Sequence, residues 1–333
     1  MKRVVGVLGA TGAVGTEMIK LLEERGFPLT ELRPLASARS AGKTLDFKGE
    51  KVTVREANAA GFQGCDIILG AAEADIAKAM IGDIKASGAV FVDNSSAFRL
   101  LPEVPLVVPE INAEDVKRHQ GIISNPNCST IITLMAVKGI EKLSHITNMI
   151  ASTYQAVSGA GVGGLRELEA QTRALSEGGP IVTGTFPYQI AENLIPRIGG
   201  IGDNNYSSEE MKLLNEGRKI MHSPDMQVTC TCVRVPVMRS HSISVSVFTE
   251  RDLTVEEVRA QLAGEAGVKL VDDAAHDIYP MPLDTSNQDL VFVGRIRKDM
   301  AFPKGIALWC CGDQIRKGAA TNAVQIAELL KQE

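Results

Sequence analysis

Apolar runs and helical patterns alternate along the first 130 residues of the chain. Residues 3–8, 65–70 and 89–93 are short apolar runs, which are typical of parallel strands buried on both faces. Helical patterns follow at 16–26 and at 74–88. Strands and helices that alternate at this spacing predict βαβ units and a parallel sheet.

The pattern changes from about residue 150. Residues 147–155 and 242–248 read as strands with one polar face. Such strands favour an antiparallel or mixed sheet that is covered on one side only. The last stretch, residues 315–333, has the pattern of an amphipathic helix.

Length and composition indicate a globular protein with two domains. The chain has 333 residues, of which 44% are hydrophobic, and this length exceeds what one core usually serves. A net charge of −5 argues against nucleic acid as a partner, because a phosphate-binding surface needs a basic surplus. No apolar run reaches the roughly 18 residues that span a bilayer, and the N-terminal run is too short for a signal peptide. We expect a cytoplasmic protein with no membrane contact.

The six cysteines do not predict a disulfide framework, because a cytoplasmic chain keeps its thiols reduced. Cys230 and Cys232, like Cys310 and Cys311, lie in apolar, strand-like segments, where we expect them to be buried. No histidine or second cysteine pair stands at zinc-binding spacing, so no metal site is expected.

A glycine-rich turn follows the first predicted strand. Gly9, Gly12 and Gly15 are spaced three residues apart and lead into a helical pattern. Glycines at such a junction let backbone N–H groups approach a phosphate at the positive end of the helix. The same glycines could simply tighten a βα turn, but their position after the first strand favours dinucleotide binding.

The end of the next predicted strand indicates which dinucleotide binds. NAD sites usually place a carboxylate there to hold the ribose 2′-hydroxyl. Residues 35–43 contain no carboxylate, whereas Ser37, Arg39, Ser40 and Lys43 could donate to a 2′-phosphate. The alternative is a solvated basic loop. This segment therefore favours NADP over NAD.

A cysteine stands where a turn meets a helix. Residues 124–127, Ser-Asn-Pro-Asn, break regular structure, and the apolar stretch 131–140 follows Cys128 closely. Asn127 or a neighbour would cap this helix, whose free N–H groups stabilise a thiolate and could hold an oxyanion. Beside a nicotinamide, such a cysteine predicts an acyl-thioester and a thiohemiacetal that hydride transfer interconverts. The alternative is a small residue chosen for packing.

His241 is the best candidate for proton transfer among the five histidines. It lies in a strand-like segment, and the usual pKa of an imidazole suits proton transfer near neutral pH. Arg234, seven residues earlier, offers a guanidinium that matches a substrate carboxylate. Pro236 and the Arg-Ser pair at 239–240 predict a bend between the two. The alternative is a structural histidine satisfied by its neighbours.

Seven motifs together resemble the aspartate-β-semialdehyde dehydrogenase family, in the family's order and over nearly the whole chain. They are GATGAVG at 9–15, ASARSAGK at 36–43, DNSSAFR at 93–99, SNPNCST at 124–130, STYQAVSGAG at 152–161, VRVPVMRSHS at 233–242 and RKGAATNAVQIAE at 316–328. The resemblance implies an α/β fold with a Rossmann-type dinucleotide-binding domain, formed by 1–127 and completed by 315–333. It implies that 128–314 form an α+β mixed-sheet domain for catalysis and dimerisation.

The resemblance also implies an activity. Members of the family carry out the reversible, NADP-dependent reductive dephosphorylation of L-aspartyl-4-phosphate to L-aspartate-4-semialdehyde and phosphate. The reaction proceeds through a cysteine thioester in the biosynthesis of aspartate-derived amino acids. We therefore expect a homodimeric enzyme with NADP as its cofactor.

The family's functional residues map onto the matching motifs. Cys128 would be the nucleophile, His241 the acid–base catalyst and Gln155 the group that orients the bound acyl chain. The expected substrate contacts are Arg234 for the α-carboxylate, Glu209 for the amine, Arg99 and Lys212 for the phosphate, and Asn127. The expected cofactor contacts are Gly9, Thr11, Gly12, Ala13, Val14, Gly15, Ser37, Arg39, Ser40, Ser158, Gly159 and Asn322. As a bare pattern, Glu209 and Lys212 would be an ordinary exposed ion pair on one helix face.

Two departures from the family pattern concern the cofactor more than the reaction. Glu73 follows the third strand, where it could repel cofactor phosphates or face solvent, and Gln314 stands where asparagine is usual. Three alternatives remain: an N-acetyl-γ-glutamyl-phosphate reductase, a non-catalytic homologue acting as an interaction protein, and a redox-sensing module. Glu209 favours a free substrate amine, intact Cys128 and His241 favour catalysis, and no resolving cysteine lies nearby.

Overall fold

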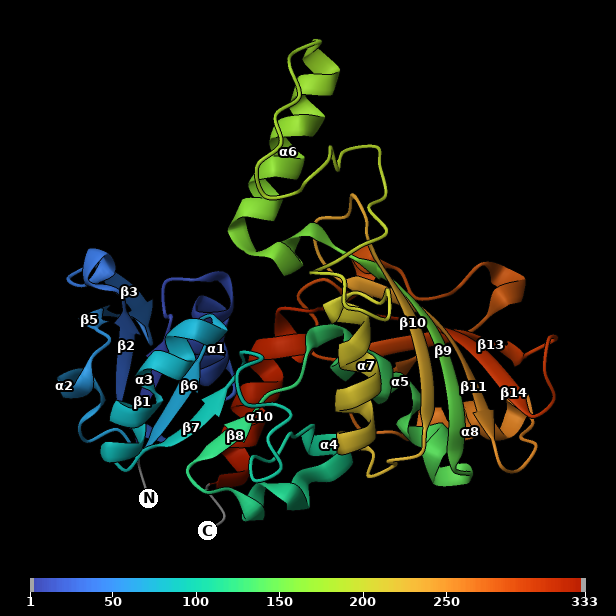
Figure 1. The fold of residues 1–333 in the computed structure, drawn as a ribbon, viewed down its shortest axis with the longest axis horizontal. Helices are drawn as coiled ribbons and strands as arrows, with labels where there is room; N and C mark the ends of the chain where they lie inside the picture. Colours follow the sequence, from blue (N-terminus) through green and yellow to red (C-terminus); the bar gives the residue numbers. More distant parts are fainter. Residues whose placement is uncertain (1–2, 331–333) are drawn as a thin grey trace. The chain divides into compact units, whose positions relative to one another are not determined.

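The computed structural model describes residues 3–330 and divides into two compact units (Figure 1). Unit 1 comprises the residues up to Asn127 together with those from Ala319 onward, and unit 2 comprises Cys128–Gly318. Residues 315–318, at the start of the last predicted helix, therefore belong to unit 2.

Unit 1 is built on a six-stranded parallel sheet with the strand order β5-β2-β1-β6-β7-β8. Its strands are β1 (Arg3–Leu8), β2 (Leu29–Ala36), β5 (Arg55–Glu56), β6 (Ile67–Gly70), β7 (Val90–Asp93) and β8 (Ile122–Ser124). Its helices are α1 (Ala13–Glu24), α2 (Ala59–Phe62), α3 (Ala74–Ala86), α4 (Pro109–Asn112) and α10 (Thr321–Leu329). A hairpin of β3 (Thr44–Phe47) and β4 (Glu50–Thr53) follows β2.

Both faces of this sheet are buried under helices. Val5 and Val7 pack into one core with α1 and α10, whereas Leu8 and Ile68 pack into a second core with α3. Successive side chains of a strand point to opposite faces, so a strand between two helical layers is apolar throughout. The predicted parallel sheet and Rossmann-type arrangement are confirmed.

The C-terminal helix is more deeply buried than the predicted amphipathic pattern implies, although Gln325 and Glu328 on one side are partly exposed. The chain first forms a π-helical turn, Arg316–Ala320, and then α10, which is buried on nearly all sides. Ala323 and Val324 join the core with α1, and polar Thr321 and Asn322 are buried as well. Asn322, for example, donates hydrogen bonds to the backbone carbonyl of Val107 and to Asn125 Oδ1.

Unit 2 contains a mixed six-stranded sheet with the order β10-β9-β11-β14-β13-β12. Its strands are β9 (Ile146–Gln155), β10 (Gln227–Arg234), β11 (His241–Thr249), β12 (Val268–Leu270), β13 (Val291–Lys298) and β14 (Gly305–Gly312). Its helices are α5 (Cys128–Leu143), α6 (Gly161–Glu177), α7 (Ser208–Ile220), α8 (Val255–Ala263) and α9 (Pro282–Thr285). The β9–β10 and β12–β13 pairs are parallel, and the other neighbours are antiparallel.

Helices cover one face of the unit 2 sheet. α5, α7 and α8 contact the strands on that face, while α6 stands away from the sheet (Figure 1). Along β9, Met149 and Ala151 are buried, whereas Ile150 and Tyr154 on the opposite face are exposed. This alternation confirms the predicted sheet with one covered face.

α5 is buried over most of its length, with Ser129–Ile140 inaccessible to solvent. Packing of this apolar helix under the sheet holds its first residue, Cys128, in a defined place. Within residues 3–330, no helix has the length and hydropathy to cross a membrane.

Candidate active site

Three of the predicted site residues meet at one edge of the unit 2 sheet. β9 ends at Gln155, its parallel neighbour β10 ends at Arg234, and the antiparallel strand β11 begins at His241 on the other side of β9. Arg234 pairs with Gln155 in the β9–β10 ladder. The predicted bend is confirmed, because residues 235–240 carry the chain from β10 to β11 past the end of β9.

Cys128 begins α5 and lies beside His241. Its Sγ is 3.5 Å from His241 Nε2. Cys128 is partly exposed, whereas the other five cysteines are buried, including the pairs for which burial was predicted. The N–H groups of the first helical turn favour a thiolate at this position. The structure thus brings the predicted nucleophile and the predicted histidine within contact distance.

The orientation of His241 is set by a backbone group. The Ala156 N–H donates to His241 Nδ1 at 3.0 Å, so the neutral ring carries its proton on Nε2, the atom nearest the cysteine sulfur. The side chain is fully buried. Burial lowers the pKa of His241 from 6.5 to about 3; the charge of Arg234 acts in the same direction and Glu209 opposes it. The imidazole is therefore neutral and acts as a donor.

Gln155 is fixed by hydrogen bonds at both ends of its amide. Thr153 Oγ1 donates to its Oε1 at 3.0 Å, and its Nε2 donates to Glu209 Oε1 at 3.2 Å. Gln155 Nε2 is also 3.4 Å from His241 Nε2. Because both nitrogens carry protons, they do not bond to each other. Two N–H donors therefore stand together next to the Cys128 sulfur, which suits a negatively charged oxygen.

Buried charges of both signs border these donors. Arg234 is buried, its Nη1 donates to the Ala156 carbonyl at 2.6 Å, and its guanidinium lies 5.9 Å from the Phe186 ring centre. On α7, Glu209 and Lys212 form an ion pair of 2.8 Å with side-chain exposures of 8% and 29%. The pair is therefore more buried than a surface pair. A guanidinium and a carboxylate near the same donors match a substrate with both an acid and an amine group.

Ser158 and Gly159, predicted to contact the cofactor, border the same cluster. A Cβ on Gly159 would lie 2.9 Å from Arg234 Nη1 and 3.2 Å from His241 Cε1, so a side chain there would displace one of them. Ser158 is buried, and its hydroxyl accepts a hydrogen bond from Gln314. Glycine at 159 therefore leaves room for the buried Arg234 and His241 side chains.

The glycine loop of unit 1 has the shape that a phosphate needs. Gly9 has a φ of +81°, and a Cβ there would lie 2.7 Å from the Ala71 carbonyl oxygen. A Cβ on Gly15 would lie 2.2 Å from the Gly9 carbonyl oxygen. Thr11 and Gly12 are exposed, and Ala13 and Val14 at the start of α1 are partly exposed. The N–H groups in the first turn of α1 have no acceptor within the helix, and this partly exposed helix start fits a dinucleotide phosphate.

The second predicted cofactor loop lies at the end of the neighbouring strand. The N–H groups of Gly9 and Ala10 both donate to the Leu35 carbonyl, which holds the glycine loop beside the end of β2. Ser37 and Arg39 are exposed there, whereas Ser40 is buried. Glu73 is exposed at the start of α3.

The other predicted residues of unit 1 are buried: Arg99 and Asn127 lie in loops after strands, and Asn322 lies in α10. Arg99 donates to the backbone carbonyls of Asn94 and Asn125 at 2.7 and 3.0 Å. Asn127 is buried, and Asn322 is fully buried in the contacts described above. These three residues lie in unit 1, whereas the cysteine, histidine, glutamine and arginine cluster lies in unit 2.

Comparison with known proteins agrees with this arrangement. Residues 4–119 match the model "Semialdehyde dehydrogenase, NAD binding domain", and residues 137–317 match "Semialdehyde dehydrogenase, dimerisation domain". The chain is 51% identical over 326 residues to the aspartate-semialdehyde dehydrogenase of Synechocystis sp., covering 98% of this chain and 96% of that protein. The chain belongs to the aspartate-semialdehyde dehydrogenase family.

Solved structures of this family have the same fold. Aspartate semialdehyde dehydrogenase II of Vibrio cholerae, also solved in complex with ASA, superposes with a TM-score of 0.97 at 42% identity and covers 100% of this chain and 99% of its own. The Candida albicans enzyme, solved with NADP, superposes with a TM-score of 0.77 at 26% identity, covering 99% of each chain.

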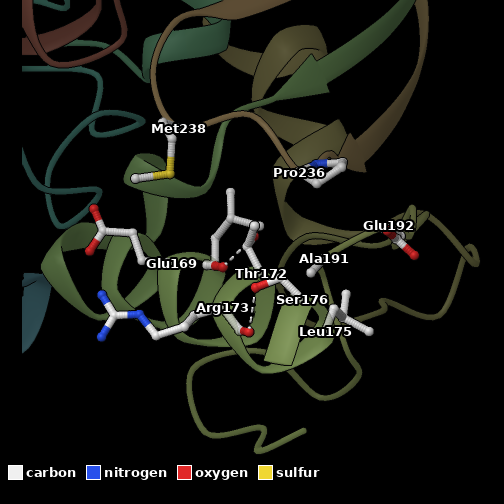
Figure 2. A pocket seen from close by; sticks show the side chains of 10 residues that line it. Glu169, Thr172, Arg173, Leu175, Ser176, Ala191, Glu192, Pro236 and Met238 are labelled. Atoms are coloured by element: carbon white, nitrogen blue, oxygen red, sulfur yellow. Dashed lines mark hydrogen bonds between the residues drawn. The ribbon is translucent and has the colours of Figure 1, made fainter. Parts of the chain in front are cut away.

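A separate cavity of about 960 Å³ lies beside α6 in unit 2 (Figure 2). Its walls come from α6, from Ala191 and Glu192, and from Pro236 and Met238, which belong to the connection between β10 and β11. The Thr172 and Ser176 hydroxyls bond to carbonyls of their own helix. This cavity therefore borders the connection between β10 and β11, and its lining does not include Cys128, Gln155, Arg234 or His241.

Two contributors to the site were missed by sequence reasoning. The Ala156 N–H, which orients His241, is a backbone group and has no signature in the side-chain sequence. Gln314 contacts Ser158 and the Ser240 N–H, and its only signal was the departure from the family's asparagine.

Proposed function

We propose that this chain is an NADP-dependent aspartate-semialdehyde dehydrogenase, which interconverts L-aspartyl-4-phosphate and L-aspartate-4-semialdehyde plus phosphate in amino-acid biosynthesis. The observation that carries the proposal is the contact of 3.5 Å between Cys128 Sγ and His241 Nε2 at the N-terminus of α5. A nucleophile, two N–H donors and a buried guanidinium together serve acyl transfer through a thioester.

In the oxidative direction, the Cys128 thiolate attacks the aldehyde carbon and forms a C–S bond, which leaves the negative charge on oxygen. Loss of hydride from that carbon would leave the acyl group on sulfur as a thioester; bound NADP would supply the hydride acceptor. A phosphate oxygen then attacks the thioester carbonyl, the C–S bond breaks, and the thiolate leaves. The balance is semialdehyde, phosphate and NADP⁺ to acyl phosphate, NADPH and one proton.

We infer that His241 acts in this sequence as a neutral hydrogen-bond donor. The resemblance implies acid–base catalysis, which would require a second proton on Nδ1, where the Ala156 N–H is located. A neutral Nε2–H and the Gln155 amide together would stabilise the oxygen that becomes negative when sulfur attacks. The thiolate is supported by the helix N-terminus, so its formation does not depend on His241 as a base.

The charged residues would select the substrate. Arg234 would hold the α-carboxylate, and Glu209 the α-amine, which distinguishes aspartyl phosphate from an N-acetylated substrate. Lys212 and Arg99 remain the expected phosphate contacts, and Asn127 a further substrate contact. Glu209 already pairs with Lys212 at 2.8 Å and accepts from Gln155 at 3.2 Å, so the substrate amine would join these existing contacts.

The nucleotide would be held by unit 1 and by the segment beside the cluster. The start of α1, which the glycine loop Gly9–Gly15 leads into, fits the pyrophosphate, and exposed Ser37 and Arg39 support NADP over NAD. Buried Ser40 is a weaker candidate for direct contact than its two neighbours. Ser158 and Gly159 are the expected contacts from unit 2, and Asn322 the expected contact from α10.

We also propose a homodimer formed through the open face of the unit 2 sheet. Ile150 and Tyr154 on β9 are 43% and 36% exposed there, and the Tyr154 ring lies 5.4 Å from the Trp309 ring on β14. Large apolar side chains on an uncovered sheet face favour association with another protein surface. The match to a dimerisation domain over residues 137–317 supports a second copy as the partner.

The activity is tested by NADP reduction that depends on phosphate. We expect turnover with L-aspartate-4-semialdehyde and little with N-acetylglutamate semialdehyde. Cys128→Ser should bind the nucleotide as the wild type does but lose nearly all turnover, because a hydroxyl without a base is a poor nucleophile. Wild-type turnover by Cys128→Ser would contradict the thioester, and preference for the N-acetylated substrate would favour the reductase alternative.

A further inference from the structure

The residue before His241 has an unfavourable backbone conformation. Ser240 has a φ of +74°, in the left-handed region that residues with a Cβ seldom adopt. Such a conformation persists only where the surroundings enforce it, and it is found disproportionately at functional sites. Because β11 begins at the next residue, the backbone at Ser240 decides where the His241 ring lies.

Gln314 enforces this conformation. Its Oε1 accepts the Ser240 N–H at 2.9 Å, and its Nε2 donates to the Ser158 hydroxyl. The preceding residue, Asp313, accepts Arg239 Nε at 2.6 Å. Gln314 is 3% exposed and Asp313 is fully buried, so neither side chain is a surface group. Arg239 and Ser240, which precede His241, thus both form hydrogen bonds with the residues that follow β14.

The same segment touches Cys128 at its other end. Asp313 Oδ1 accepts the N–H groups of Ile315 and Arg316, and the Asp313 carbonyl accepts the Gly318 N–H at 3.0 Å, which winds the π-helical turn. A Cβ on Gly318 would lie 3.0 Å from Cys128 Cβ and 3.3 Å from its Cα. π-Helical turns are rare and occur frequently at functional sites. Because residue 318 is a glycine, the backbone of this turn packs directly against Cys128.

We propose that residues 313–318 form a brace that fixes the positions of Cys128 and His241 relative to each other. Gln314 is the principal positioning residue of this brace. One end of the brace holds the backbone before the histidine, and the other packs on the first residue of α5. The proposal deepens the proposed function and rests on it, since the brace serves the thioester chemistry. It also explains why the amide at 314 is buried among catalytic neighbours.

The test is Gln314→Met, which keeps the volume but removes the acceptor for the Ser240 N–H. We expect kcat to fall on the order of 10–100-fold, as for a small misplacement of reacting groups, with less than about threefold change in KM for the semialdehyde. The matched control is Gln171→Met, another buried glutamine of unit 2, which accepts the N–H groups of Ile190 and Ala191 at 2.9 and 3.1 Å. It should lower stability and leave kcat unchanged.

A second arm uses glycine at 240. Glycine adopts a positive φ without strain, so Ser240→Gly in the Gln314→Met background should recover at least about a third of the lost kcat. If kcat did not recover in the double variant, the proposed role of the brace would be contradicted. A raised Kd for NADP with an unchanged kcat in Gln314→Met would also overturn it, because Gln314 would then be a nucleotide contact.

A third readout does not depend on turnover. The ¹⁵N resonances of the His241 ring, assigned by comparison with His241→Gln, report which nitrogen carries the proton. We expect the Nε2–H form in the wild type and in Gln171→Met, and mixed or shifted signals in Gln314→Met. An inactive wild type would contradict the proposed function. The spectra would still show whether Gln314 positions the His241 ring. Identical spectra in all three proteins would overturn it.

Discussion

At the scale of single residues, the site depends on one backbone N–H. The Ala156 amide occupies His241 Nδ1, so the ring faces the Cys128 sulfur with its protonated nitrogen. Gln155 presents a second N–H beside it, locked by Thr153 and Glu209. The chemistry of the cluster therefore follows from donor and acceptor positions as much as from residue types.

Replacement of His241 separates hydrogen-bond donation from proton transfer. His241→Ala should lower kcat by about 10²–10³-fold, the usual cost of one oxyanion donor. His241→Gln keeps an N–H donor but cannot transfer protons near neutral pH, so its kcat should exceed that of His241→Ala at least about tenfold. Steady-state kinetics with both folded variants decides the matter, since equal inactivity would restore the acid–base role.

Burial of neutral His241 also predicts a pH dependence of stability. The pKa of His241 falls to about 3 in the folded chain from a usual 6.5, so below about pH 6.5 the unfolded chain binds a proton that the folded chain does not. Denaturant titrations should show the wild type losing up to about 1.4 kcal/mol per pH unit relative to His241→Gln as the pH falls. Parallel curves for the two would contradict a neutral buried ring.

The cofactor prediction concerns Arg39. If its exposed guanidinium meets the 2′-phosphate, Arg39→Ala should weaken NADP binding by roughly 1.5–3 kcal/mol and leave NAD binding nearly unchanged. Lys20, 56% exposed on α1, is a suitable control cation. Calorimetric titration of both nucleotides measures the difference. Equal affinity of the wild type for NADP and NAD would remove Arg39 from this role and direct attention to Glu73.

At the scale of elements, a buried ion cluster joins α5 to the end of α8. Glu265 lies 3.0 Å from Lys138 and 2.8 Å from Lys142. The side chains of Lys138 and Glu265 are 4% and 3% exposed, whereas that of Lys142 is 57% exposed. Since Cys128 begins α5, this cluster helps to hold the helix that carries the nucleophile.

Removal of the buried carboxylate should therefore be costly. Glu265→Gln leaves Lys138 without its charge partner and should lower the free energy of unfolding by about 3–5 kcal/mol, whereas Lys142→Met should cost less than about 1 kcal/mol. Burial raises the pKa of Glu265, but the hydrogen bonds from Lys142 and Lys138 outweigh it and bring the value to about 2. The contribution is thus present above pH 4.5 and lost as the pH falls toward 2. Denaturant titration at pH 7 and at pH 3 measures it; a pH-independent difference would refute this account.

At the scale of the whole molecule, the uncovered face of the unit 2 sheet predicts where the dimer forms. Ile150→Asp places a charge in the middle of that face and should convert a dimer into monomers, because an unpaired charge does not fit a buried apolar contact. Ile76→Asp, on an exposed position of α3 in unit 1, should remain dimeric. Sedimentation velocity at micromolar concentration distinguishes the species. A dimeric Ile150→Asp protein would place the interface elsewhere.

Much of this molecule was determined by local sequence alone. Periodic apolar runs predicted the parallel sheet of unit 1 and the one-sided sheet of unit 2, because strand periodicity follows directly from which faces are buried. The glycine turn and the cysteine after Asn-Pro-Asn were also readable, since turn chemistry and helix starts are properties of a few consecutive residues. The motif order identified the family.

Other features were decided only by tertiary structure. The C-terminal helix has an amphipathic pattern, yet unit 1 also buries polar Asn322, which finds partners more than a hundred residues away in sequence. Arg234 and His241 lie seven residues apart in sequence but meet Gln155 only because β9 pairs between their strands. The tautomer of His241 and the contact of Gly318 with Cys128 depend on backbone atoms from distant segments, which carry no signature in the order of side chains.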